Sequence, residues 1–181
     1  MRGVSRLLPA LMLASLSTQG AAQPAPACLS EPEMRSLIVY AMPEVADQLG
    51  KACAPSLPSA AYLVRSRADL VTRYSAAAAP EASVARQAFF KVAGLGSGKL
   101  DALDETAVHS LISIGIASAL EKGIKPGSCR VVNDVLEQLA PLPPQNMAAL
   151  ISLALREVGN KPGAGDKTNN PFRICGTEEG H

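Results

Sequence analysis

The chain has 181 residues, of which 48% are hydrophobic, 18% charged and only 3% aromatic, and its formal net charge is +1. A charge so close to zero creates no field that would attract nucleic acid. With no Trp, three Tyr and three Phe, the chain also has few rings on which bases or sugars could stack. We therefore expect no nucleic-acid partner.

Residues 1–22 have the pattern of a secretory signal peptide. Arg2 and Arg6 precede an apolar run from Leu7 to Leu16, and small residues follow up to Ala22, which suits cleavage before Gln23. The apolar run is about half as long as a membrane-spanning helix needs to be. The sequence therefore predicts an exported protein, periplasmic or secreted, whose mature chain has no transmembrane segment.

The remaining 159 of the 181 residues are enough for one domain. Their apolar residues recur at helical spacing, and no stretch alternates as a half-buried strand does. We expect an all-α, compact bundle of about six or seven helices over residues 23–159. Residues 160–181 are polar and rich in glycine at their start, and we expect a loop-rich C-terminal tail that a disulfide ties down.

The first half of the mature chain predicts four helices. Ser30 and Glu33 form a capping box at the start of the first, which we expect to end at Met42 because Pro43 follows. Pro43 then begins a second, short helix. The third and fourth are marked by apolar residues at helical spacing, and Pro80 divides them: Tyr62, Leu63, Leu70, Val71 and Tyr74, then Val84, Ala88, Phe89 and Val92.

The second half predicts three more helices, of which residues 101–122 form the longest. This segment is apolar around nearly its whole circumference, which is typical of the centre of a bundle, so Leu111 and Ile112 should point into the core. The other two helices should begin at Ser128 and Pro144. Their expected inner residues are Val131, Val132, Val135, Leu136 and Leu139, then Met147, Leu150, Ile151, Ala154 and Val158.

Four cysteines, Cys28, Cys53, Cys129 and Cys175, predict two disulfides in an exported chain. Three pairings are possible. We favour Cys28 with Cys53 and Cys129 with Cys175, because each pair brackets a local helical unit. Lipidation of Cys28 is disfavoured because this residue lies well beyond the apolar run of the leader.

Motifs for catalysis or cofactor binding are not found in the sequence. The glycine loop of residues 94–99 lacks the spacing of a phosphate-binding loop, and the signatures of serine hydrolases and zinc proteases are missing. His109 with Glu105 one turn before it could act in acid–base chemistry, but local pairing on a helix explains them better. Asp101, Asp104 and Glu105 suit the start of a helix. We expect no cofactor and no metal, and an enzyme is less expected than a binding protein.

Basic residues concentrate between positions 60 and 100, where six bases face two acids. Residues 101–160 hold seven acids and four bases, so the two regions could present faces of opposite sign. The alternative is an ordinary solvated helix face, because Arg65, Asp69 and Arg73 follow each other at four-residue spacing. The candidate interaction face consists of Arg65, Arg67, Arg73, Arg86 and Lys91.

The sequence thus favours an exported, non-enzymatic helical protein that acts by binding a partner. That partner could be another protein or an anionic component of the cell envelope. The alternative is a small periplasmic enzyme or ligand carrier with an interhelical pocket near His109.

Overall fold

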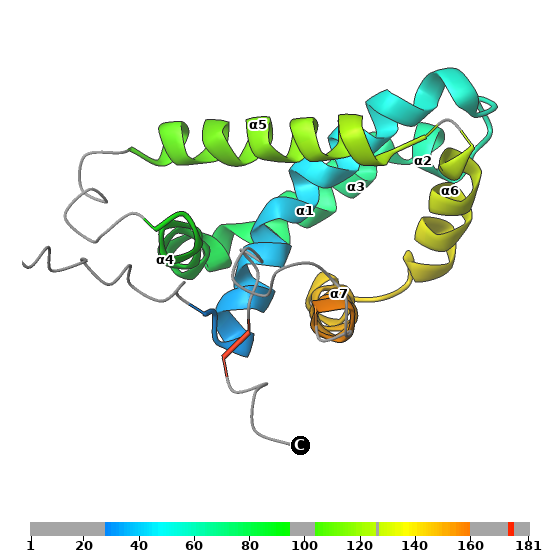
Figure 1. Ribbon diagram of the computed structural model, residues 1–181. Helices are drawn as coiled ribbons and strands as arrows, with labels where there is room; N and C mark the ends of the chain where they lie inside the picture. The colour runs from blue at the N-terminus through cyan, green and yellow to red at the C-terminus, as the bar shows by residue number, and fades with distance from the viewer. Residues whose placement is uncertain (1–27, 95–103, 126, 160–173, 176–181) are drawn as a thin grey trace, which may run out of the picture.

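The computed structural model describes residues 28–94, 104–125, 127–159 and 174–175 (Figure 1). The described part is all-α, as predicted, and its only strand pairing is a single parallel bridge between Leu29 and Ile174. Two disulfides are present. The leader, residues 95–99 of the glycine loop and Asp101 lie outside the described residues. The helices are α1 (Glu31–Cys53), α2 (Tyr62–Arg65), α3 (Arg67–Ala78), α4 (Ala82–Val92), α5 (Glu105–Gly123), α6 (Ser128–Leu139) and α7 (Pro144–Gly159).

Helix α1 is the central element of the bundle. It runs through the molecule and packs on α3, α4, α5 and α7 (Figure 1). No residue from Ser36 to Gly50 is exposed. With 23 residues it is longer than α5, which has 19. The prediction that residues 101–122 form the longest and central helix was therefore wrong.

Helix α5 lies at the edge of the bundle because only one of its faces is covered. Val108 and Ile112 are buried against Phe90 of α4, as expected for Ile112. Leu111 is 44% exposed, in contrast to its predicted place in the core. A helix that is apolar all round is central only if other helices surround it. In this fold α1 occupies the centre, so α5 is left at the edge.

Pro43 lies inside α1 and does not end it, contrary to our prediction of two helices. A proline in a helix interior removes one backbone hydrogen bond and crowds the carbonyl of the residue four positions earlier, at a cost of roughly 3 kcal/mol. The turns on both sides of Pro43 are anchored by Val39, Met42 and Ala46, all buried. Burial of these side chains offsets the cost, so the helix continues.

The start of α1 forms the capping box that the sequence predicts. Glu33 donates its backbone N–H to Ser30 Oγ, and the backbone N–H of Ser30 donates to the Glu33 carboxylate at 2.7 Å. Lys91 of α4 lies 3.0 Å from the same carboxylate. Burial raises the pKa of Glu33, but the hydrogen bonds from Ser30 and Lys91 outweigh this effect and hold the pKa below its usual value of 4.5.

The disulfides join Cys28 to Cys175 and Cys53 to Cys129, so the predicted pairing was wrong. The continuous α1 helix explains the difference. It separates Cys28 from Cys53 by its own length, about 35 Å at 1.5 Å per residue, whereas disulfide-bonded Cα atoms lie roughly 4.4–6.8 Å apart. Cys53 therefore bonds to the start of α6, and Cys28 bonds to the C-terminal segment beside the Leu29–Ile174 bridge.

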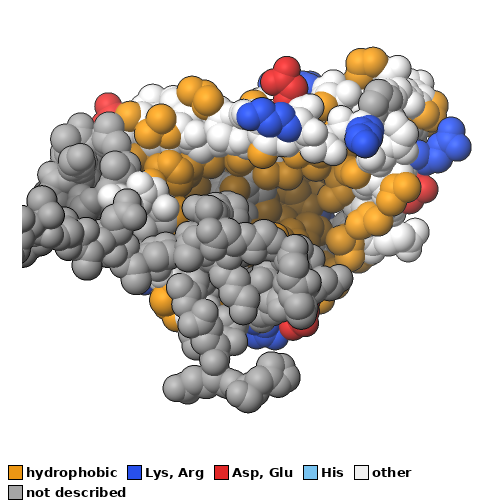
Figure 2. Space-filling view, viewed as in Figure 1, with side chains coloured by type: hydrophobic (Ala, Val, Ile, Leu, Met, Phe, Trp, Pro, Cys, Tyr) orange, Lys and Arg blue, Asp and Glu red, His pale blue; other side chains and the backbone are white. Residues whose placement is uncertain are grey.

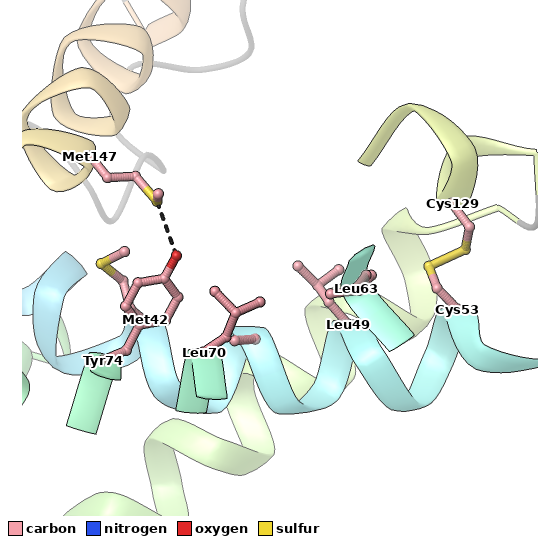
Figure 3. Packing of buried hydrophobic residues seen from close by; sticks show 9 residues of the cluster. Met42, Leu49, Cys53, Leu63, Leu70, Tyr74, Cys129 and Met147 are labelled. Carbon is pink, nitrogen blue, oxygen red and sulfur yellow. Dashed lines mark hydrogen bonds between the residues drawn. A yellow bond between two sulfur atoms is a disulfide. The ribbon is translucent and has the colours of Figure 1, made fainter. Parts of the chain in front are cut away.

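The main core forms where α1, α2, α3 and α7 meet (Figure 3). Met42 and Leu49 of α1 contribute to it, with Leu63 of α2 and Leu70 of α3. The predicted third helix is split at Ser66 into α2 and α3.

Two polar contacts join C-terminal helices to this core. The Tyr74 hydroxyl donates to Met147 Sδ of α7 at 3.6 Å. The buried N–H of Leu63 donates to Asn133 Oδ1 of α6 at 2.9 Å. They hold α7 and α6 against the N-terminal helices.

We predict that Leu63→Ala lowers the free energy of unfolding by roughly 2–5 kcal/mol, because the side chain of Leu63 is fully buried and its removal leaves a cavity. Leu111→Ala is the matched control and should cost at most about 1 kcal/mol, because Leu111 is largely solvated. Urea melts measure both values. Equal losses for the two variants would contradict the position of α5 at the edge.

We predict that Glu33→Gln lowers stability at neutral pH by about 1 kcal/mol, because the amide can still accept from the Ser30 N–H but loses the ion pair with Lys91 and the negative charge that the helix N-terminus favours. The folded-state pKa of Glu33 is depressed, so its contribution is present above the unfolded pKa and is lost as the pH falls through the folded pKa. Denaturant melts between pH 7 and pH 2.5 should therefore show the two proteins converging in acid. A constant difference over this range would contradict the assignment.

Candidate binding groove

Large aliphatic side chains are exposed mainly on the three C-terminal helices. Of the nine exposed large hydrophobic residues in the described ranges, eight belong to α5, α6 and α7, and only Val84 belongs to an earlier helix. The eight are Leu111, Ile114, Val131, Val135, Leu150, Ile151, Leu153 and Leu155. Isolated exposed hydrophobic residues are common, and these eight lie on more than one face of their helices, but their concentration on the last three helices favours an interaction surface in this part of the molecule.

Helix α6 exposes part of its apolar face because two contacts, which we call the tethers, attach a different face of the helix to the N-terminal helices. Cys129 bonds to Cys53, and Asn133 accepts from the Leu63 N–H. These residues are four positions apart and share one side of the helix. A step of two residues turns a helix by about 200°, so Val131 and Val135 lie nearly opposite the tethers, 63% and 49% exposed.

This orientation differs from the one expected for α6. The polar residue Asn133 is buried. Val131 and Val135 were placed inward but face solvent, while Val132, Leu136 and Leu139 pack partly buried against the core, as predicted. In this orientation Val131 and Val135, which belong to the apolar face of α6, remain in contact with solvent.

Helix α7 is apolar on more than one face, and only its beginning is well covered. Met147, Ala148 and Ser152 are buried. Ile151 and Leu155 continue the Met147 face at four-residue spacing, yet they are 37% and 38% exposed. The predicted burial of Met147 is confirmed. Ile151, Leu150 and Ala154 were expected inside but are exposed, and the side chain of Val158 lies outside the described part.

Between α5 and α6 the surface is hollowed and apolar. Figure 2 shows hydrophobic side chains at the base of a depression below α5 and beside α6. The depression stays open because α5 and α7 pack on α1 and α6 packs on α2, whereas α5, α6 and α7 do not pack extensively on one another. We call this depression the apolar groove. Partly buried aliphatic residues of the elements around it pack against the main core: Ile38 and Val45 of α1, Leu120 of α5, and Val132 and Leu136 of α6.

The five basic residues of the candidate interaction face each contact another part of the chain. Arg65 pairs with Glu137 at 2.9 Å, Arg67 with Asp47 at 3.9 Å and Lys91 with Glu33 at 3.0 Å. Arg73 donates to the Ala140 carbonyl, and the Arg86 guanidinium lies over the Phe90 ring.

The structure does not bring these five residues together into one patch. Arg65 lies near the end of α1, because α2 packs there, and Lys91 lies at its start. Those two points are about 30 Å apart along the helix. The contacts of Arg65, Arg67, Arg73 and Lys91 join separate parts of the bundle, and the Arg86–Phe90 contact lies within α4.

Three other cations have no partner. Lys122, Lys125 and Arg130 are exposed. Among the described Lys and Arg residues, only these three have side chains that form neither an ion pair nor a hydrogen bond. We call them the cation cluster. Sequence reasoning missed them because they fall in a region that is acidic in sum, although the three lie within nine consecutive residues.

His109 is exposed on α5 and packs edge-on against the Tyr40 ring of α1, with ring centroids 6.4 Å apart. Burial raises the pKa of Tyr40, the Glu105 carboxylate raises it further, and Arg86 lowers it.

Asp104 caps α5 by accepting from the Ala107 N–H at 2.7 Å. Within the described residues no group of His, Cys, Asp and Glu is arranged to hold a metal ion.

Among the described helices, none is long and apolar enough to cross a membrane. Comparisons with protein-family models, with curated proteins and with solved structures find no match. The features that bear on function are therefore the groove, the exposed aliphatic residues and the cation cluster.

We predict that the double variant Val131→Gln/Val135→Gln keeps the free energy of unfolding within about 0.5 kcal/mol, because both side chains already face water. It should also bind less anilinonaphthalene sulfonate, a dye that reports exposed apolar surface. Val132→Gln, one position away but packed on the core, is the control and should destabilise by more than about 1 kcal/mol. Similar destabilisation by both changes would show that α6 is oriented differently.

Proposed function

We propose that the protein is an exported, non-enzymatic binding protein that holds an apolar partner on the apolar groove beside α1, α5 and α6. The observation that carries this proposal is the uneven burial of the two halves. The N-terminal helices expose one large apolar residue, Val84, whereas α5, α6 and α7 expose eight. A partner would cover what the fold leaves in water.

The magnitude of apolar burial fits a binding role. Burying one Val, Leu or Ile side chain is worth about 1.5–3 kcal/mol. Association costs at least about 4 kcal/mol in lost freedom of motion. The exposed residues are 37–66% exposed, so each contributes only about half of this value, and a partner must cover most of the eight for burial to exceed the cost of association.

Export is supported by the leader pattern of residues 1–22 and by the disulfides. Both described disulfides link parts of the chain distant in sequence, with separations of 76 and 147 residues, as in structural disulfides of extracytoplasmic proteins. We place the mature protein in the periplasm or outside the cell.

Photocrosslinking in the producing cells tests the binding role. We predict that p-benzoylphenylalanine at Val135 or at Ile151 gives adducts after irradiation, because both positions border the uncovered apolar surface. The same residue at Asp69, exposed on α3, is the control and should give none. Intact-mass spectrometry then reports the mass of the partner. Absence of adducts at Val135 and Ile151, or equal adducts at all three positions, would refute the proposal.

The same preparations test export. We predict that the mature chain purified from the periplasm or the medium begins at Gln23, because cleavage follows the small residues that end the leader. Sequencing of the N-terminus measures this directly. A protein that retains Met1 and stays in the cytoplasm would contradict the assignment.

A further inference from the structure

We propose that the occupant of the apolar groove is an amphiphile with an aliphatic chain and an anionic head group. The chain lies in the groove, and the head group lies beside the cation cluster of Lys122, Lys125 and Arg130. This inference rests on the proposed function and specifies its ligand.

The composition of the exposed surface favours an aliphatic chain over a protein partner. All nine exposed large hydrophobic residues in the described ranges are Val, Ile or Leu. Protein–protein interfaces are instead enriched in aromatic residues and Met, and their energetic anchors are mainly Trp, Tyr and Arg, with Leu and Val under-represented. The chain has no Trp. A surface of branched aliphatic side chains matches a hydrocarbon better than it matches another folded protein.

The cation cluster supplies the charge complementarity. Other described Lys and Arg side chains are held in contacts within the chain, whereas these three are solvated and unpaired. Glu121 is the only acidic residue between positions 121 and 130, so this stretch has a local charge of +2. An anionic head group is the ligand that such a cluster attracts.

The fold holds the cation cluster at one end of the groove. Lys122 lies in the last turn of α5, and Arg130 lies in the first turn of α6. The Ser128 N–H donates to the Lys125 carbonyl at 2.8 Å, which closes the turn between these helices. The Cys53–Cys129 disulfide fixes this junction to the end of α1. In Figure 2, Lys and Arg side chains lie along the rim of the depression, over the end of α5 and the start of α6.

The concave shape favours one bound amphiphile over attachment to a membrane surface. A bilayer is flat on the scale of this domain, so it would contact convex faces and leave the depression in Figure 2 empty. A single chain removed from the bilayer fills a depression between helices, and each buried methylene contributes about 0.8 kcal/mol.

Calorimetric titration of the full chain with three dodecyl compounds, below their micelle concentrations, tests this inference. The probes share a chain and differ in head group: dodecanoate is anionic, dodecyl maltoside uncharged and dodecyltrimethylammonium cationic. We expect dodecanoate to bind roughly tenfold more tightly than dodecyl maltoside, and the cationic compound to bind most weakly. Added salt should reduce the preference for dodecanoate.

Two sets of variants assign the parts of the site. Replacing Lys122, Lys125 and Arg130 together by Gln should reduce dodecanoate affinity roughly to that of dodecyl maltoside and leave the latter unchanged. The control removes a cation at the opposite end of α1, Arg35→Gln, where the side chain is exposed, and should change neither affinity. Val135→Gln/Ile151→Gln should weaken all three probes alike. Thermal melts identify any variant that fails to fold.

Each adverse result has a defined meaning. Equal affinities for the three probes, unaffected by the triple substitution, would overturn the anionic head group but keep an apolar ligand. Binding to phosphatidylglycerol vesicles without binding of monomeric dodecanoate would replace the bound amphiphile by a membrane surface. No binding of any probe, together with crosslinking of Val135 to a protein, would overturn this inference and leave the proposed function standing. If no probe binds and Val135 and Ile151 give no crosslinks, both this inference and the proposed function are refuted.

Discussion

Continuity of α1 through Pro43 is the constraint on which the rest of the fold depends. A break at Met42 would leave two short helices that could fold back on each other and bring Cys28 near Cys53. The unbroken helix keeps these cysteines apart and provides one long rod on which α3, α4, α5 and α7 pack. The buried side chains of Val39, Met42 and Ala46 stabilise this rod against the local cost of the proline.

A second constraint acts on α6 and determines which of its residues face solvent. The Cys53–Cys129 disulfide and the Leu63–Asn133 hydrogen bond fix the rotation of this helix. A freely packing amphipathic helix would turn its valines inward, and the apolar groove would close. The tethers bury a polar residue instead, because an unpaired Leu63 N–H in the core would be costly. The groove is thus a consequence of how α6 is attached.

The sequence was informative where local chemistry decides the structure. Helical periodicity predicted the fold class, and Ser30 and Glu33 predicted the start of α1, because a capping box acts within four residues. Periodicity was misleading where long-range packing decides. It could not show that α5 would be left at the edge, that Asn133 would be buried or that Pro43 would be tolerated, because each depends on neighbours distant in the chain.

The same limit applies to the candidate site. Counting charges over long windows pointed to Arg65, Arg67, Arg73, Arg86 and Lys91, but a count does not distinguish cations with partners from cations without them. Only the folded arrangement shows that these five make internal contacts and that Lys122, Lys125 and Arg130 do not. Whether an amphiphile uses the latter three is a question for the titrations.

The disulfide pattern has a consequence for the order of events during biogenesis. A chain that enters an oxidising compartment N-terminus first presents Cys28 and Cys53 long before Cys129 and Cys175, whose partners lie 76 and 147 residues away. Oxidation in order of emergence would join the first two cysteines, the pairing that the native α1 forbids. Early formation of α1 would keep the two thiols apart until translocation is complete. A chain oxidised before that helix forms would need a disulfide isomerase to reach the native state.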